Sequence, residues 1–131
     1  MTQQIVLAIC SFALALLGTL LLSALSLVGT PSDSRALTLL KEWLSPKQLA
    51  CYERSRYFDV VGSDTGTHYR IHYGTQTNIE ELSHAGQRVC RWCFVPEGNL
   101  VAGDVMLAQK IALETNERGA LAVAHRSFVS M

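Results

Sequence analysis

Two cysteines with the spacing of metal and redox motifs are the first residues that could do chemistry. Cys90 and Cys93 form a CxxC pattern, which zinc knuckles and thiol redox sites use at a turn or a helix start. Apolar residues flank this pair and favour a strand, in which residues three apart point to opposite faces. A zinc site would also need Cys51 and His84. We therefore predict half-buried thiols and no metal or cofactor, with Cys51, Cys90 and Cys93 as the weak alternative ligands.

A second chemical pattern is the tetrapeptide Asp64-Thr65-Gly66-Thr67. It resembles the short signature of aspartic proteases of the retroviral type, in which two such loops pair their aspartates around a water. That resemblance implies a hydrolase built on Asp64 in a homodimer. It covers four residues only, and Gly62 and Ser63 stand where that family has an apolar strand. The same residue types are preferred in a hairpin turn, which is the interpretation we favour.

A third pattern is a row of basic residues, His68, Arg70 and His72, that alternates with Tyr69 and Ile71. Alternation with period two places the basic row on one face of a strand. Such a row could hold a phosphate, a carboxylate or an anionic lipid headgroup. The alternative is a solvated face paired with carboxylates such as those of the Glu80–Glu81 segment.

The patterns in the rest of the chain predict a small α+β domain that positions these residues. Four strands are predicted at 56–61, 67–73, 77–82 and 87–95, and their short turns favour an antiparallel four-strand meander covered by helices. A helix should run from Ser45, Pro46 and Gln48, which suit a capping box, to about 54. A second helix is predicted at 104–116, with Ile111 on its apolar side and Lys110 on its exposed side. A last helical piece is expected at 120–125.

The segment from Ile5 to Val28 contains no charged residue and no proline. About 20 such residues cross the hydrocarbon layer of a bilayer, so we predict a transmembrane helix at 1–29. One side of that helix carries small residues, which allow another membrane helix to pack closely. This predicted helix-packing face consists of Ala8, Ser11, Ala15, Gly18, Thr19, Ser23 and Ser26.

Residues 30–45 are predicted as a linker and an amphipathic juxtamembrane helix, and residues 46–131 as the small domain. Trp43 could anchor the amphipathic helix in the membrane interface, or that helix could belong to the domain core. Basic residues follow the apolar segment while none precedes it, so the positive-inside rule puts the N-terminus outside and the domain in the cytoplasm. Eleven basic and eleven acidic residues give no net charge, which argues against a nucleic acid partner.

Two functions are compatible with these patterns. The first is a single-pass, non-catalytic accessory or docking subunit of a larger membrane protein complex. Its partners would be the lipid bilayer and another transmembrane helix, either a larger subunit's or its own copy's. The alternative is a membrane-tethered thiol or metal-binding module at Cys90 and Cys93, or a hydrolase built on Asp64. We expect that the protein is not an enzyme.

Overall fold

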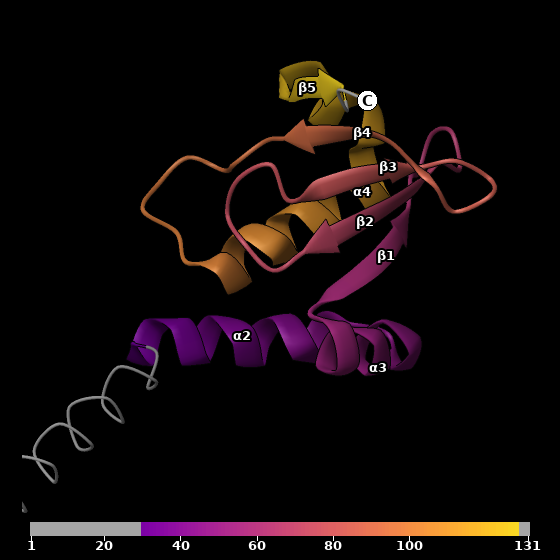
Figure 1. Cartoon of the computed structure of the whole chain (residues 1–131). Helices are drawn as coiled ribbons and strands as arrows, with labels where there is room; N and C mark the ends of the chain where they lie inside the picture. Colours follow the sequence, from indigo (N-terminus) through magenta and orange to yellow (C-terminus); the bar gives the residue numbers. More distant parts are fainter. Residues whose placement is uncertain (1–29, 129–131) are drawn as a thin grey trace, which may run out of the picture. The chain divides into compact units, whose positions relative to one another are not determined.

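The computed structural model describes residues 30–128 (Figure 1). The chain divides into two compact units, 1–31 and 32–131, and the second contains the helices and strands of the folded domain apart from Pro31, the first residue of the first helix. The predicted transmembrane helix and its face of small residues lie outside the described residues. Within residues 30–128, no helix is both long enough and apolar enough to span a bilayer.

Two helices open the described part, α2 (Pro31–Trp43) and α3 (Pro46–Ser55). The predicted capping box is present: the Ser45 hydroxyl accepts from the Gln48 backbone N–H, and the Gln48 side chain accepts from the Ser45 backbone N–H. Leu40 of α2 is fully buried in the domain core, whereas the Trp43 side chain is 58% exposed at the end of that helix.

The five strands form one antiparallel sheet in the order β1-β2-β3-β4-β5. Their bounds are Tyr57–Val61, His68–His72, Ile79–Leu82, Arg88–Cys93 and His125–Phe128. The first four confirm the predicted meander, but the prediction of only four strands is wrong. β5 pairs with β4 along the edge of the sheet, and it begins at His125, where the helical piece expected at 120–125 was to end. Because β5 is short and exposed throughout, no apolar alternation marks it in the sequence.

Helix α4 (Ala102–Val123) lies across one face of the sheet (Figure 1). Its early turns pack tightly on α2, since a side chain at Gly103 would meet the Ala36 backbone at 2.5 Å. The predicted end near 116 is a break, because Asn116 has non-helical backbone angles. The helix restarts there because the Ser63 hydroxyl accepts from the Glu117 N–H and the Asp64 carboxylate accepts from the Arg118 N–H.

The buried side of α4 differs from the predicted apolar side. Lys110 is 8% exposed and Ile111 is 39% exposed, the reverse of the prediction. Polar residues on the buried side have specific partners: Lys110 pairs with Glu114, and Gln109 exchanges two hydrogen bonds with Asn78. A buried polar group that is hydrogen-bonded escapes the desolvation penalty, so hydropathy alone does not predict which side turns inward.

Candidate functional site

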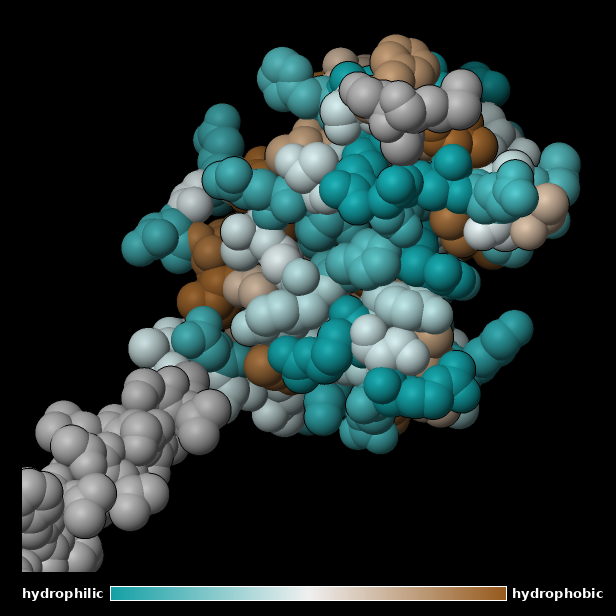
Figure 2. Space-filling view, viewed as in Figure 1, coloured by the Kyte–Doolittle hydropathy of each residue, from teal (hydrophilic) through white to brown (hydrophobic). Residues whose placement is uncertain are grey.

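The face of the sheet opposite α4, which we name the outer face, carries the predicted basic row. Tyr69 and Ile71 of β2 are buried toward α4, so His68, Arg70 and His72 lie on the outer face, as the alternation predicted. Figure 2 shows that hydrophilic residues predominate over the strands on this side. This placement makes the outer face the candidate site.

Arg70 is held by a carboxylate of the neighbouring strand. Its Nε and Nη2 donate to the two oxygens of Asp59 at 2.8 and 3.0 Å, and its guanidinium lies 4.2 Å from the ring centroid of Tyr57. The hydrogen bond to Asp59 raises the pKa of Arg70 above its ordinary value, against the effect of burial. Arg70 and Asp59 therefore form a neutral, bidentate pair on this face.

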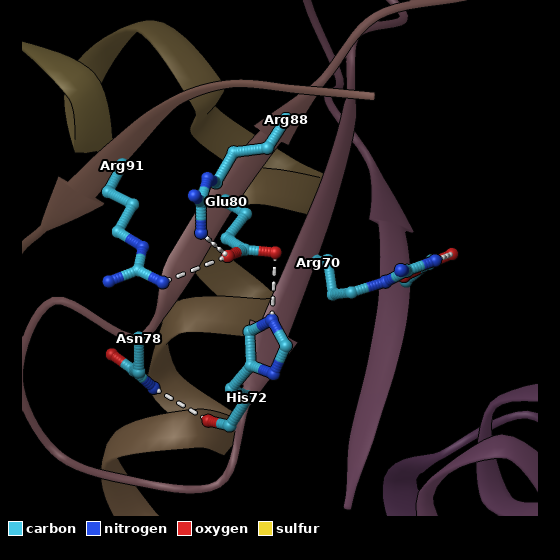
Figure 3. A network of polar contacts seen from close by, with 7 residues as sticks. Arg70, His72, Asn78, Glu80, Arg88 and Arg91 are labelled. Atoms are coloured by element: carbon cyan, nitrogen blue, oxygen red, sulfur yellow. Dashed lines mark hydrogen bonds and ion pairs between the residues drawn. The ribbon is translucent and has the colours of Figure 1, made fainter. Parts of the chain in front are cut away.

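The second element of the outer face is a network around Glu80 (Figure 3). Arg88 Nη1 and Arg91 Nη2 donate to the same carboxylate oxygen, Oε1, at 3.0 and 3.3 Å. His72 Nε2 lies 2.9 Å from the other oxygen. Burial would raise the pKa of Glu80, but the hydrogen bonds from His72, Arg88 and Arg91 outweigh it and lower that pKa to about 2. Glu80 is thus an anion throughout the physiological range.

His68 lies apart from that network. Its exposed side chain lines a hollow of about 280 Å³ between α3 and the sheet, together with Lys47, Cys51 and Asp59. The three members of the basic row therefore have three different surroundings. Only His72 belongs to the cluster in which several cationic side chains meet.

Arg88 and Arg91 were missed as site residues at the sequence level. Arg91 lies opposite Glu80 in the β3–β4 register, and Arg88 reaches the same carboxylate beside a register shift at Glu81 and Leu82. A charge count along the chain cannot supply that register. The sequence did contain one indication of this cluster. Two arginines lie three residues apart on one strand, and a pair of glutamates lies on the strand before it.

Within the described residues, Cys51, Cys90 and Cys93 are free thiols. Cys90 is fully buried in β4, where its Sγ lies 3.2 Å from Glu81 Oε2 and accepts from Arg126 Nε at 3.3 Å. Burial raises the pKa of the Cys90 thiol. Cys93 is the last residue of β4 and lies opposite His125 of the neighbouring β5. Across residues 30–128, no three His, Cys, Asp or Glu side chains are grouped so as to hold a metal ion.

Asp64 lies in the turn between β1 and β2, which is the predicted hairpin turn. Its carboxylate accepts from the Arg118 backbone N–H at 2.9 Å, and its own backbone N–H donates to Glu117 at 2.8 Å. Glu117 is fully buried and also accepts from the Thr65 hydroxyl and the Tyr69 phenol, both at 2.6 Å. Burial would raise the pKa of Glu117, but these hydrogen bonds lower it. Asp64 therefore helps attach the hairpin to α4.

The chain matches no known protein family, and neither curated proteins nor solved structures contain a match to it.

Proposed function

We propose that this chain is a single-pass membrane protein and a non-catalytic accessory or docking subunit of a larger membrane complex. The observation that carries the proposal is the uncharged segment from Ile5 to Val28, followed directly by a small folded domain. Small residues recur along one side of that segment, which suits close packing with a second membrane helix.

The roles of the chemically capable residues support a non-catalytic domain. Asp64 caps the restarted part of α4, and Cys90 packs in the sheet between Glu81 and Arg126. These side chains already contribute to the fold. The thiol-module and hydrolase alternatives are therefore less well supported than docking.

The side of the membrane is part of the proposal. Arg35, Lys41, Lys47, Arg54 and Arg56 follow the apolar segment, whereas no lysine or arginine precedes it. The positive-inside rule then favours a cytoplasmic domain and an outer N-terminus.

Membrane association can be tested by alkaline extraction of membranes from cells that express the full chain. The chain should remain in the pellet, and its recovery in the alkaline supernatant would refute the membrane proposal. Protease treatment of sealed vesicles then reports the side on which the domain lies. The domain should be digested in inside-out vesicles and protected in right-side-out vesicles, and the reverse result would refute the proposed topology.

The accessory role can be tested by purification in a mild detergent, followed by mass spectrometry. Larger membrane subunits should copurify in fixed stoichiometry, and Ala15→Leu or Gly18→Leu should release them. Ala13→Leu is the matched control, because a helical period places Ala13 on the opposite side of the segment. A chain that purifies alone, or only with copies of itself, would contradict an accessory role.

A further inference from the structure

Glu80 brings two arginines together on the outer face. The Glu80 side chain is 12% exposed, whereas those of Arg88 and Arg91 are 37% and 45% exposed. Both guanidinium groups point to one oxygen of this carboxylate, and the His72 ring approaches the other (Figure 3). Glu80 therefore lies beneath a group of outward-reaching cationic side chains and orients them.

The charges of this cluster do not cancel. Arg88 and Arg91 contribute two positive charges against the one negative charge of Glu80, and protonation of His72 adds a third positive charge. The nearby Arg70 is compensated by Asp59 and adds nothing to the excess. The Glu80 cluster is thus a local positive centre in a chain with no formal net charge.

The two guanidinium groups also have N–H donors that Glu80 does not use. A guanidinium carries five N–H groups in a planar fork. Among residues 30–128, Arg88 and Arg91 each donate one hydrogen bond, in both cases to Glu80. A hollow of about 200 Å³ is lined in part by His72, Glu80 and Arg91. A small anion in this hollow would meet N–H donors of Arg91, whose direction Glu80 has already set.

We propose that Arg88, Arg91 and His72, oriented by Glu80, bind a phosphate group on the outer face of the sheet. A phosphate offers three terminal oxygens, enough to accept from two guanidinium forks and an imidazole, whereas a carboxylate offers two. Its charge near neutral pH also exceeds that of a carboxylate, which matches the positive excess of the cluster. The phosphate can come from a soluble phosphate compound or from a phospholipid whose headgroup ends in a phosphomonoester, such as phosphatidic acid.

The first experiment uses the full chain in an uncharged detergent, labelled with ¹⁵N-arginine and titrated with inorganic phosphate at constant ionic strength. The Nε–H signals of Arg88 and Arg91 should shift together and saturate, and acetate should bind more weakly. Arg88→Gln and Arg91→Gln should each weaken phosphate binding by about tenfold. Arg118→Gln, which removes an exposed guanidinium from α4, is the matched control and should change nothing.

The second experiment separates the two sources of phosphate. The full chain is placed in phosphatidylcholine nanodiscs, with and without phosphatidic acid. Shifts of the Arg88 and Arg91 signals on addition of phosphatidic acid identify a lipid headgroup. Shifts with inorganic phosphate in pure phosphatidylcholine identify a soluble ligand. This readout requires no partner complex, so its outcome is distinct from that of the copurification test.

Three results would overturn the phosphate site. These are the absence of saturable shifts with both inorganic phosphate and phosphatidic acid, equal binding of acetate, or an equal effect of Arg118→Gln. Backbone amide spectra of each variant check that the fold is retained. Arg88→Lys and Arg91→Lys provide a second test, because lysine keeps the charge and loses the fork, and these variants should also bind phosphate more weakly.

Discussion

Two carboxylates, Glu117 and Glu80, organise opposite sides of the sheet in different ways. Both have a lowered pKa, yet Glu117 is fully buried and Glu80 retains some exposure. Glu117 accepts from neutral donors, namely two backbone N–H groups, a threonine hydroxyl and a tyrosine phenol. Glu80 accepts from side chains that carry charge and reach solvent.

The difference shows how a carboxylate's donors indicate its role. Neutral donors converging on Glu117 bring the β1–β2 turn onto α4, so this carboxylate connects segments more than fifty residues apart. Cationic donors converging on Glu80 leave a positive excess at the surface. The first arrangement stabilises the fold, and the second leaves cationic side chains exposed on the outer face.

Removal of the buried Glu117 carboxylate should cause the largest loss in the free energy of unfolding. Glu117→Ala leaves four buried or partly buried donors without their acceptor, and we expect a loss of about 3–5 kcal/mol in the free energy of unfolding. Urea denaturation of the full chain in a nonionic detergent measures this loss. Glu97→Ala, in an exposed loop, is the control and should change stability by less than about 0.5 kcal/mol. A similar small change for Glu117→Ala would remove the structural role assigned to this carboxylate.

A substitution that crowds the Glu117 carboxylate should cause the next largest loss in the free energy of unfolding. A side chain at Gly62 would begin 2.3 Å from the Glu117 carboxylate carbon, so Gly62→Ala should cost about 1–3 kcal/mol. The cost should fall when Glu117 is already alanine, because the clash is then absent. A double-mutant cycle by urea denaturation checks this coupling. Additive costs would show that Gly62 is required for another reason.

Glu80→Gln should cost less than the buried substitution, about 1 kcal/mol, because its cationic partners can turn to solvent. That cost should shrink in about 1 M salt, which screens exposed charges, whereas the cost of Glu117→Ala should be nearly unchanged. Urea denaturation at low and high salt measures both. An equal salt response of the two variants would contradict the distinction between charged and neutral donors.

The contribution of Glu80 should also disappear in acid. Because the folded-state pKa is lowered from 4.5 to about 2, the stabilisation is fully present above pH 4.5 and is lost as the pH falls toward 2. The advantage of the wild type over Glu80→Gln should therefore fall steadily as the pH drops from 4.5 toward 2. Denaturation curves between pH 2 and 6 test this expectation, with Glu97→Gln as control. A constant difference across that range would refute the lowered pKa.

Local patterns in the sequence were sufficient for several features of the domain. Alternation along β2 separates Tyr69 and Ile71 from the basic row, because neighbouring strand residues point to opposite faces. The types and spacing of Ser45 and Gln48 predicted the capping box, which closes within three residues. Each of these features depends only on near neighbours in the chain.

Only the tertiary structure decided which distant residues meet. The burial of Glu117, the break at Asn116 and the convergence of Arg88 and Arg91 on Glu80 all depend on partners from other elements. The β5 strand likewise forms through its pairing with β4, without an apolar alternation of its own. Periodicity in the sequence indicates which side of a helix or strand a residue occupies. Strand register and long-range hydrogen bonds determine which residue it meets, and the chemistry of the outer face depends on those partners.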